Sequence, residues 1–189
     1  MNKPRLDSVQ FVPLLERSAA DQERVRQLRN APEVRCHMYS DHEIGVPEHA
    51  AWLASLAANP SQRAWVVLYM GNIEGLVSLS AIKPQHQSAE WAFYLSPAMQ
   101  GQGVGGLVEF RLLDLAFGEF GLQKLNCEVL ASNPKVIEMH QKFGFTLEGT
   151  RRANVIKDGR RTDVALLGIL AHEWAAQRPR FARLFGADN

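Results

Sequence analysis

The sequence predicts a mixed α/β domain with a central sheet and helices on its faces. Three observations predict this fold class. Strand-like apolar runs alternate with segments of helical period, a glycine cluster separates one strand from a long apolar helix, and two turn signals mark β-hairpins. The 189 residues are enough for one core, and we expect one domain over residues 1–189, without repeat or linker.

The first third of the chain is predicted as a strand followed by two helices. Residues 9–14 form a short apolar run that is typical of a strand. Residues 21–30 carry spaced apolar residues among charges, which is the pattern of a short amphipathic helix. Pro47 opens a second helix, because proline suits the first helical turn. Residues 31–45, between the two helices, are expected to be irregular.

A hairpin and a third strand follow. Residues 64–70 and 73–82 are rich in apolar and β-branched residues, and Gly71-Asn72 between them is a turn signal. Residues 91–95 have the character of a further strand, which Pro97 ends.

The second half alternates helices and strands. Residues 104–117 follow the helical period with a wide apolar face, so this helix is expected to be largely buried. Residues 124–130 are predicted as a strand, and Asn133 suits the N-cap of the next helix. Two last strands flank the turn signal of residues 157–159, and the basic tail after His172 is predicted to be helical.

Composition excludes several function classes. The net charge of +1 gives no broad electrostatic basis for binding nucleic acid. Cys36 and Cys127 lie far apart and form no CxxC pair, so they are expected to be reduced thiols and not a disulfide or metal framework. No apolar run is long enough to span a membrane, and residues 1–5 do not begin a signal peptide. We therefore expect a cytoplasmic protein.

The glycine cluster at residues 100–106 follows a strand and opens a helix, which is the place where backbone N–H groups attract phosphate. A Walker A loop is excluded because no Gly-Lys-Ser/Thr is present. Residues 101–106 do fit the dinucleotide pattern GxGxxG, but they lie mid-chain and no acidic residue closes a second strand about 20 residues later. A glycine-rich turn that only caps a core helix stays open as an alternative.

The same cluster also has the form Gln/Arg-x-x-Gly-x-Gly/Ala, with Gln100, Gly103 and Gly105 at the defined positions. Together with Asn133 and the ending Gly144-Phe145, it resembles the GNAT N-acetyltransferase superfamily over residues 64–170. The resemblance implies the GNAT acetyltransferase fold, acetyl-CoA as cosubstrate and no metal. It also implies a set of cofactor-binding residues: Leu95, Gln100, Gly101, Gln102, Gly103, Val104, Gly105, Gly106 and Asn133.

A narrower resemblance lies in the N-terminal region. Residues 28–35, residues 38–44 and Glu48-His49 look like the corresponding region of PseH-type enzymes, which acetylate the 4-amino group of a UDP-linked 4-amino-4,6-dideoxy sugar in pseudaminic acid synthesis. The resemblance implies a UDP-amino sugar as the acceptor. Its implied acceptor-binding residues are Arg29, Met38, Tyr39, His49, Trp52 and Ser80. Apart from the resemblance, Arg29 would be a solvated surface charge and Trp52 a core or interface aromatic.

Acetyl transfer needs an N–H donor for the developing oxyanion and a proton for the departing thiolate. By the resemblance, the donor is backbone near Tyr94 or Leu95, and the side chain of Tyr94 is either at the acceptor or an ordinary strand aromatic. His140 stands where the superfamily usually has the tyrosine that protonates the thiolate. An imidazolium can do this at neutral pH, but His140 lies on an apolar helix face, so a structural histidine is the alternative.

The amine must lose a proton as it attacks, and Glu128 is the candidate relay, with Glu90 a weaker one. The alternative for Glu128 is a strand glutamate that faces solvent. Asp41, His42, Glu43 and His49 match no metal motif, so no metal is expected.

The sequence therefore predicts an N-acetyltransferase that works by direct attack, with neither cysteine as a nucleophile. Two rivals remain. One is an acetyltransferase of protein N-termini or of small amines, and the other is a non-catalytic sensor of acyl-CoA. Exposed ends of the predicted sheet make a homodimer plausible, and we expect no nucleic-acid or membrane partner.

Overall fold

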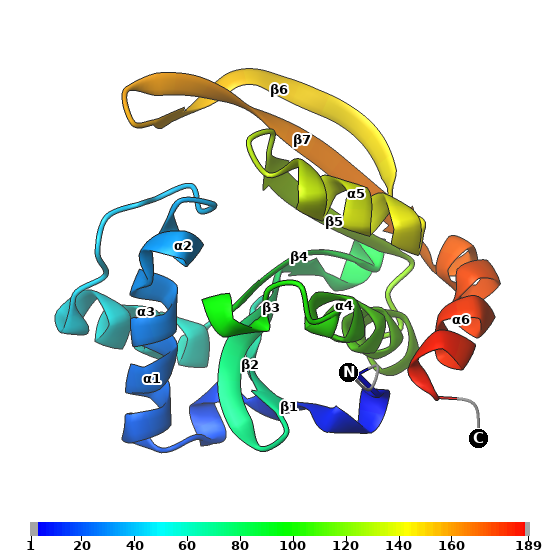
Figure 1. Ribbon diagram of the computed structural model, residues 1–189, viewed down its shortest axis with the longest axis horizontal. Coiled ribbons are helices and arrows are strands. Elements are labelled where there is room, and N and C mark those ends of the chain that lie inside the picture. The colour runs from blue at the N-terminus through cyan, green and yellow to red at the C-terminus, as the bar shows by residue number, and fades with distance from the viewer. Residues whose placement is uncertain (1–3, 188–189) are drawn as a thin grey trace.

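The computed structural model describes residues 4–187, so the first three residues of the N-terminal segment considered above lie outside it. Within the described residues, seven strands form one sheet in the order β1-β2-β3-β4-β5-β7-β6 (Figure 1). The strands are β1 Val9–Pro13, β2 Arg63–Tyr69, β3 Asn72–Lys83, β4 Ser88–Leu95, β5 Lys124–Leu130, β6 Thr146–Lys157 and β7 Arg160–Leu170. All neighbours pair antiparallel except β4 and β5, which run parallel. The predicted mixed central sheet is confirmed.

Helices cover both faces of this sheet (Figure 1). They are α1 Ala19–Asn30, α2 Pro32–Arg35, α3 Val46–Ala58, α4 Val104–Asp114, α5 Pro134–Phe143 and α6 Ala171–Phe185. Two hydrophobic clusters separate the faces, because side chains alternate along a strand. In β2, Trp65 and Val67 belong to the cluster of α4, α5 and α6, whereas Val66 belongs to the cluster that α1 and α3 complete.

The predicted helical tail is α6, and it packs through aromatic rings. The rings of Phe143 and Phe181 stack with centroids 4.0 Å apart, and Trp174 is only 2 % exposed. Burial of each such side chain stabilises the fold by roughly 1.5–3 kcal/mol. The C-terminal helix is thus part of the main core.

Both predicted hairpins are present. Met70 and Gly71 have positive φ values of 50° and 83°, and Asp158 and Gly159 have 48° and 73°. Two consecutive residues with positive φ form the type I′ turn, whose twist matches that of the flanking strands. The turn residues set the register next to each turn, and irregularities farther along both strand pairs then shift it.

The structure differs from the prediction in three places. Residues 31–45 are not entirely irregular, because Pro32 starts the short helix α2. After α4, the chain continues in a π-helical turn, Leu115–Glu119. Asn133 does precede α5, but its side chain makes no capping hydrogen bond within the described residues, so capping does not account for it.

The parallel pair β4 and β5 stays together over only three residues of each strand. Ser88–Glu90 pair with Lys124–Asn126, and the pairing then stops although both strands continue. From there β5 pairs with β7 alone, along its whole length. The sheet therefore opens between the second halves of β4 and β5.

Candidate functional site

The opening of the sheet leaves part of β4 without a partner on one side. Over Trp91–Leu95, β4 pairs with β3 but no longer with β5 within the described chain. Backbone N–H groups on that side are free to bind another acceptor, as buried backbone donors require a partner. This edge contains Tyr94 and Leu95, the region in which we expect the oxyanion donor.

The glycine cluster lies directly beyond this edge. Gly101 and Gly103 have φ values of 72° and 78°, a conformation that favours glycine. Gly103 is the N-cap of α4 and, within the described range, no side chain caps this helix end. The N–H groups of the first helical turn therefore point outward and can bind an anion.

The two following glycines serve packing. A Cβ atom at Gly105 would lie 3.4 Å from the sulfur of Met139, and one at Gly106 would lie 3.3 Å from Cζ of Phe185. Gln100 and Gln102 are exposed beside them, and the Gln102 side chain donates to the carbonyl of Ala98 at 2.5 Å. Glycine therefore permits positive φ in the turn, and inside α4 it leaves room for neighbouring side chains.

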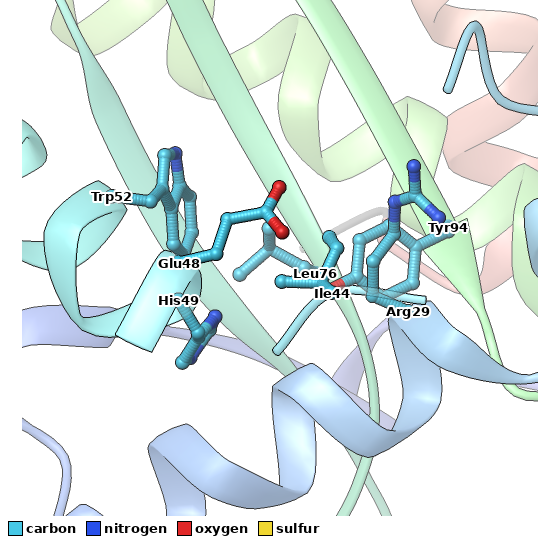
Figure 2. Close-up of a pocket in the computed structure, with 7 residues that line it drawn as sticks. All are labelled: Arg29, Ile44, Glu48, His49, Trp52, Leu76 and Tyr94. Carbon is cyan, nitrogen blue, oxygen red and sulfur yellow. The ribbon is translucent and has the colours of Figure 1, made fainter. Parts of the chain in front are cut away.

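A cavity of about 270 Å³ lies on the opposite face of the sheet, between α1, α3 and strands β3 and β4 (Figure 2). Most of its wall is apolar. It is lined by Arg29, Ile44, Glu48, His49, Trp52, Leu76 and Tyr94. Four of the predicted residues therefore meet here, although they come from three separate elements. Ile44, Glu48 and Leu76 were not predicted as site residues, although Ile44 and Glu48 lie in the stretches that resemble PseH-type enzymes.

Arg29 and Tyr94 form one wall of this cavity. The Arg29 Nη2 donates to the carbonyl of Ser40 at 2.9 Å, while its buried Nη1 has no hydrogen-bond partner among residues 4–187. Burial lowers the pKa of Arg29 and raises the pKa of Tyr94. The Tyr94 hydroxyl donates to the carbonyl of Val25 at 3.2 Å, which ties β4 to α1. The unbonded Nη1 leaves Arg29 able to bind an anionic ligand.

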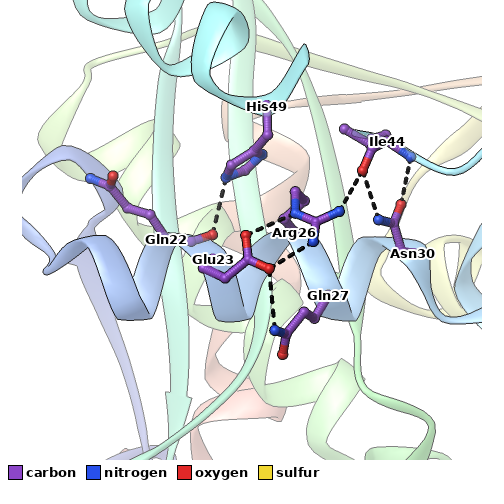
Figure 3. Close-up of polar contacts among 7 residues, drawn as sticks. All are labelled: Gln22, Glu23, Arg26, Gln27, Asn30, Ile44 and His49. Carbon is purple, nitrogen blue, oxygen red and sulfur yellow. Dashed lines mark hydrogen bonds and ion pairs between the residues drawn. The ribbon is translucent and has the colours of Figure 1, made fainter. Parts of the chain in front are cut away.

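His49 supports the opposite wall. Its Nε2 lies 3.0 Å from the carbonyl of Gln22 (Figure 3), and its ring is 5.3 Å from that of Trp52. Burial lowers the pKa of His49, so the neutral ring can donate its N–H to this carbonyl at neutral pH. His49 therefore holds α3 and Trp52 against α1.

The remaining predicted acceptor residues lie elsewhere. Tyr39 is 49 % exposed, and its hydroxyl donates to Glu128, whose other oxygen accepts from Arg151. Burial and this bond raise the pKa of Tyr39. Among the described residues, Met38 and Ser80 do not line the cavity of Figure 2. The two predicted proton relays differ in their surroundings. Glu128 is half-buried, and both of its carboxylate oxygens accept hydrogen bonds. Glu90 is exposed and pairs with Ser80 across β3 and β4.

His140 is 2 % exposed, and its Nδ1 lies 2.9 Å from Oε1 of the fully buried Glu109. The rings of Trp91 and Phe145 pack around it, 5.1 and 5.3 Å away. Burial alone would lower the pKa of His140, but the Glu109 carboxylate and the Cys127 thiol raise it to about 10. Burial also raises the pKa of Glu109, and the contact with His140 counteracts part of this rise.

The sequence reasoning missed Glu109, although a carboxylate inside an apolar helix face is a signal for a buried partner. Burial against Glu109 favours the structural alternative for His140. Its role as an acid stays a prediction.

No group of three or more His, Cys, Asp or Glu side chains in the described part of the chain could hold a metal ion. His42 instead bonds Glu48, with 2.9 Å between Nε2 and Oε1. None of the described helices has both the length and the apolar character needed to cross a membrane.

Comparisons with known proteins find a matching family and several relatives. The family described as "Acetyltransferase (GNAT) domain" matches residues 13–146. The spermidine N(1)-acetyltransferase of Escherichia coli K12 is 29% identical over 174 residues, which are 92% of each chain. The acetyltransferase PseH of Campylobacter jejuni is 24% identical over 132 residues, 70% of this chain and 81% of that one.

Solved structures show the same fold. A spermidine N-acetyltransferase from Vibrio cholerae, solved in complex with CoA and spermine, matches with a TM-score of 0.82 and 24% identity over 89% of this chain and 99% of that one. The same enzyme has also been solved as a dodecamer. Of the two relatives named above, the one with the higher identity and coverage carries the name of a polyamine acetyltransferase.

Proposed function

The chain belongs to the GNAT acetyltransferase family, whose members use acetyl-CoA, and we propose that it acetylates the 4-amino group of a UDP-linked amino-deoxy sugar. The observation that carries this acceptor is the cavity in Figure 2, which gathers Arg29, His49, Trp52 and Tyr94. Arg29, His49 and Trp52 match the PseH-type pattern, and PseH itself is a relative at 24% identity.

The chemistry of the cavity suits a deoxy sugar. Its walls are mostly apolar, and Ile44, Trp52 and Leu76 can pack on a sugar ring and its methyl group. Arg29 can donate its unbonded Nη1 to a phosphate of the nucleotide, because guanidinium binds phosphate strongly. The cavity of about 270 Å³ is slightly smaller than the range of roughly 300–1,000 Å³ for ligand pockets. It would therefore hold the sugar, with the nucleotide extending outward past Arg29.

The residues around the opening of the sheet would bind and orient the cosubstrate. The first turn of α4 and the preceding glycine loop offer backbone N–H groups to a pyrophosphate. The free edge of β4 near Tyr94 and Leu95 offers an N–H donor to the thioester oxygen as negative charge develops there. Bound acetyl-CoA supplies the activated acetyl group and a thiolate leaving group.

Two side chains remain candidates for moving protons. Glu128 would receive the amine proton through water, and its bonds from Tyr39 and Arg151 would hold it in place. His140 would protonate the departing thiolate, since its ring lies among residues of β4 and next to Cys127 of β5, where the strands separate. Asn133 remains a candidate contact to the cosubstrate, since no capping bond uses its side chain within residues 4–187.

A second candidate acceptor is a polyamine such as spermidine. Relatives named as spermidine acetyltransferases favour it, at 29% identity over 92% of this chain. In the cavity, however, Glu48 is the one carboxylate among the described lining residues, and it already bonds His42. A long polycation would need several carboxylates along its length, so the geometry favours the sugar.

The test is thiol release from acetyl-CoA by the purified protein with a panel of acceptors. The panel contains UDP-4-amino-4,6-dideoxy-N-acetyl sugars, spermidine, and a peptide with a free N-terminus. We expect turnover with a UDP-amino sugar at a kcat/KM at least tenfold above that for spermidine. Preference for spermidine would establish the second candidate, and binding of acetyl-CoA without turnover on any amine would indicate a sensor.

The acid role of His140 has a separate test. If His140 protonates the thiolate, His140→Phe should lower kcat by about 10²-fold or more while acetyl-CoA still binds, as expected when a general acid is removed. An unchanged kcat would show that His140 serves structure alone.

A further inference from the structure

Lys157 lies at the end of β6, beside the turn of the β6–β7 hairpin. Its ammonium group is bonded to another segment of the chain and does not extend into solvent. Its Nζ donates to the carbonyl of Met38 at 2.8 Å and to the carbonyl of Arg35 at 3.3 Å. It also forms an ion pair with Asp41, with 3.2 Å between Nζ and Oδ2. A lysine ammonium has three donors, so these three contacts use its full capacity.

The burial of this side chain supports a specific role. Lysines are mostly exposed, yet the side chain of Lys157 is only 10 % exposed. All three partners lie in one segment, residues 35–41, which precedes Lys157 by more than 110 residues in the chain. In Figure 1 the hairpin of β6 and β7 extends over α2, the helix that leads into this segment.

The same stretch of chain is anchored at its other end by α1 (Figure 3). The side-chain amide of Asn30 accepts from the N–H of Ile44 at 2.8 Å and donates to its carbonyl at 2.9 Å. Arg26 donates to the same carbonyl at 2.6 Å. Ile44 in turn lines the cavity. Residues 35–44 are therefore fixed at both ends.

The middle of this stretch carries the contacts on which the site depends. The backbone of Ser40 accepts from Arg29, and the hydroxyl of Tyr39 donates to Glu128. A shift of the segment would move both, so their positions depend on its two anchors. One anchor belongs to α1 beside the cavity, but the other comes from a distant hairpin.

We infer that Lys157 is a positioning residue, which locks residues 35–41 against the β6–β7 hairpin and thereby sets Arg29, Tyr39 and Glu128 for the acceptor. This inference rests on the proposed function in one respect, namely that the cavity beside this segment binds the acceptor. Lys157 acts through the segment and not on the reacting atoms.

The test compares Lys157→Met with Arg160→Met. Methionine keeps much of the side-chain volume and removes the ammonium, and Arg160 is exposed and pairs with Lys157 in the same hairpin. Hydrogen exchange of peptides covering residues 36–45 is measured in both variants and in the natural protein. We expect exchange at least about tenfold faster in Lys157→Met and unchanged in Arg160→Met. Asp41→Asn, which removes the ion pair alone, should give a smaller increase.

Steady-state kinetics provide the second measurement. Lys157→Met should raise KM for the acceptor by about tenfold, while KM for acetyl-CoA stays within about twofold, because the segment lies on the acceptor side. Equal changes in both KM values, or unchanged exchange of residues 36–45, would overturn the inference. The kinetics use whichever amine the acceptor panel identifies as the substrate. The role of Lys157 is therefore tested even if the acceptor is not a UDP-amino sugar.

Discussion

Among single residues, the buried pair of Glu109 and His140 has the largest energetic consequence. The side chain of Glu109 is fully buried, and its Oε2 has no hydrogen-bond partner among the described residues. A buried ion pair costs desolvation free energy that its own attraction barely returns, whereas removal of one partner leaves a buried group uncompensated. Replacing one residue of the pair should therefore lower the free energy of unfolding more than replacing both.

This difference gives the first prediction. Glu109→Leu should lower the free energy of unfolding by about 3–5 kcal/mol, because it leaves His140 buried without its partner. The double variant Glu109→Leu/His140→Phe should lose clearly less, since both polar groups are gone. Urea unfolding of the natural protein and the single and double variants measures this. Losses that simply add would contradict a coupled pair.

Arg29 gives a prediction about the acceptor. Arg29→Met should raise KM for a UDP-amino sugar by about tenfold or more, because a guanidinium–phosphate contact is lost. KM for spermidine should not rise, because spermidine has no phosphate to bind. Arg24→Met is the matched control, since Arg24 is exposed on the same helix. An equal effect of Arg29→Met on both acceptors would contradict a phosphate contact.

At this scale the sequence indicates part of the site. The resemblance assigns Arg29, His49 and Trp52 to the acceptor and gives Tyr94 as a further possibility, and these four line one cavity. Met38, Tyr39 and Ser80, which it also assigns to the acceptor, are not among the residues that line it. It could not show that Tyr39 bonds Glu128, because the two are 89 residues apart and meet only in the folded chain. The partner of His140 was missed for the same reason, as Glu109 lies 31 residues earlier on another helix.

Among the elements, the start of α4 has the clearest functional meaning. Gly103 adopts φ 78° at the N-cap, and a Cβ there would lie 3.3 Å from Cγ of Pro4. A left-handed conformation costs a residue with a Cβ about 1–2 kcal/mol. The geometry of the loop therefore depends on glycine at this position.

A loop variant follows as the third prediction. Gly103→Ala should raise KM for acetyl-CoA several-fold, because the strained turn would shift the N–H groups at the start of α4. KM for the acceptor should stay nearly unchanged, since the acceptor cavity lies on the other face of the sheet. Gly118→Ala is the control, because its φ is not positive and no atom would lie within 4 Å of the new Cβ. A change in acceptor KM alone would contradict the assignment of the loop to the cosubstrate.

The sequence predicts most elements because their signals are local. Both hairpin turns have two residues with positive φ, Met70-Gly71 and Asp158-Gly159. The predicted signals were residues 157–159, which contain the second turn, and Gly71-Asn72, which lies one residue after the first turn because Asn72 already belongs to β3. The short helix α2 was missed because four residues show no helical period. The Asn133 side chain was taken as a cap from its residue type, but capping also depends on the geometry of the chain around it.

Across the whole molecule, the decisive feature is the parallel pair that separates after three residues. The separation gives the sheet a free internal edge on β4, close to the glycine loop, while the acceptor cavity lies on the face covered by α1 and α3. Strand order and the point of separation depend on which helices fill each face. No local pattern in the sequence contains that information, so neither the strand order nor the separation was predicted.

The last prediction concerns the stability of the whole chain against pH. The Glu109 carboxylate, together with the Cys127 thiol, raises the pKa of His140 from 6.5 in the unfolded chain to about 10, although burial lowers it. A raised pKa in the folded state gives stability that is complete below pH 6.5 and is lost as pH rises through about 10. The free energy of unfolding should therefore fall by a few kcal/mol over this range, relative to the Glu109→Leu/His140→Phe variant. Other titrating groups are common to both proteins and cancel in the difference. Urea unfolding at pH 6, 8 and 10 measures it, and a difference that does not change with pH would show that the pair holds no proton of its own in the fold.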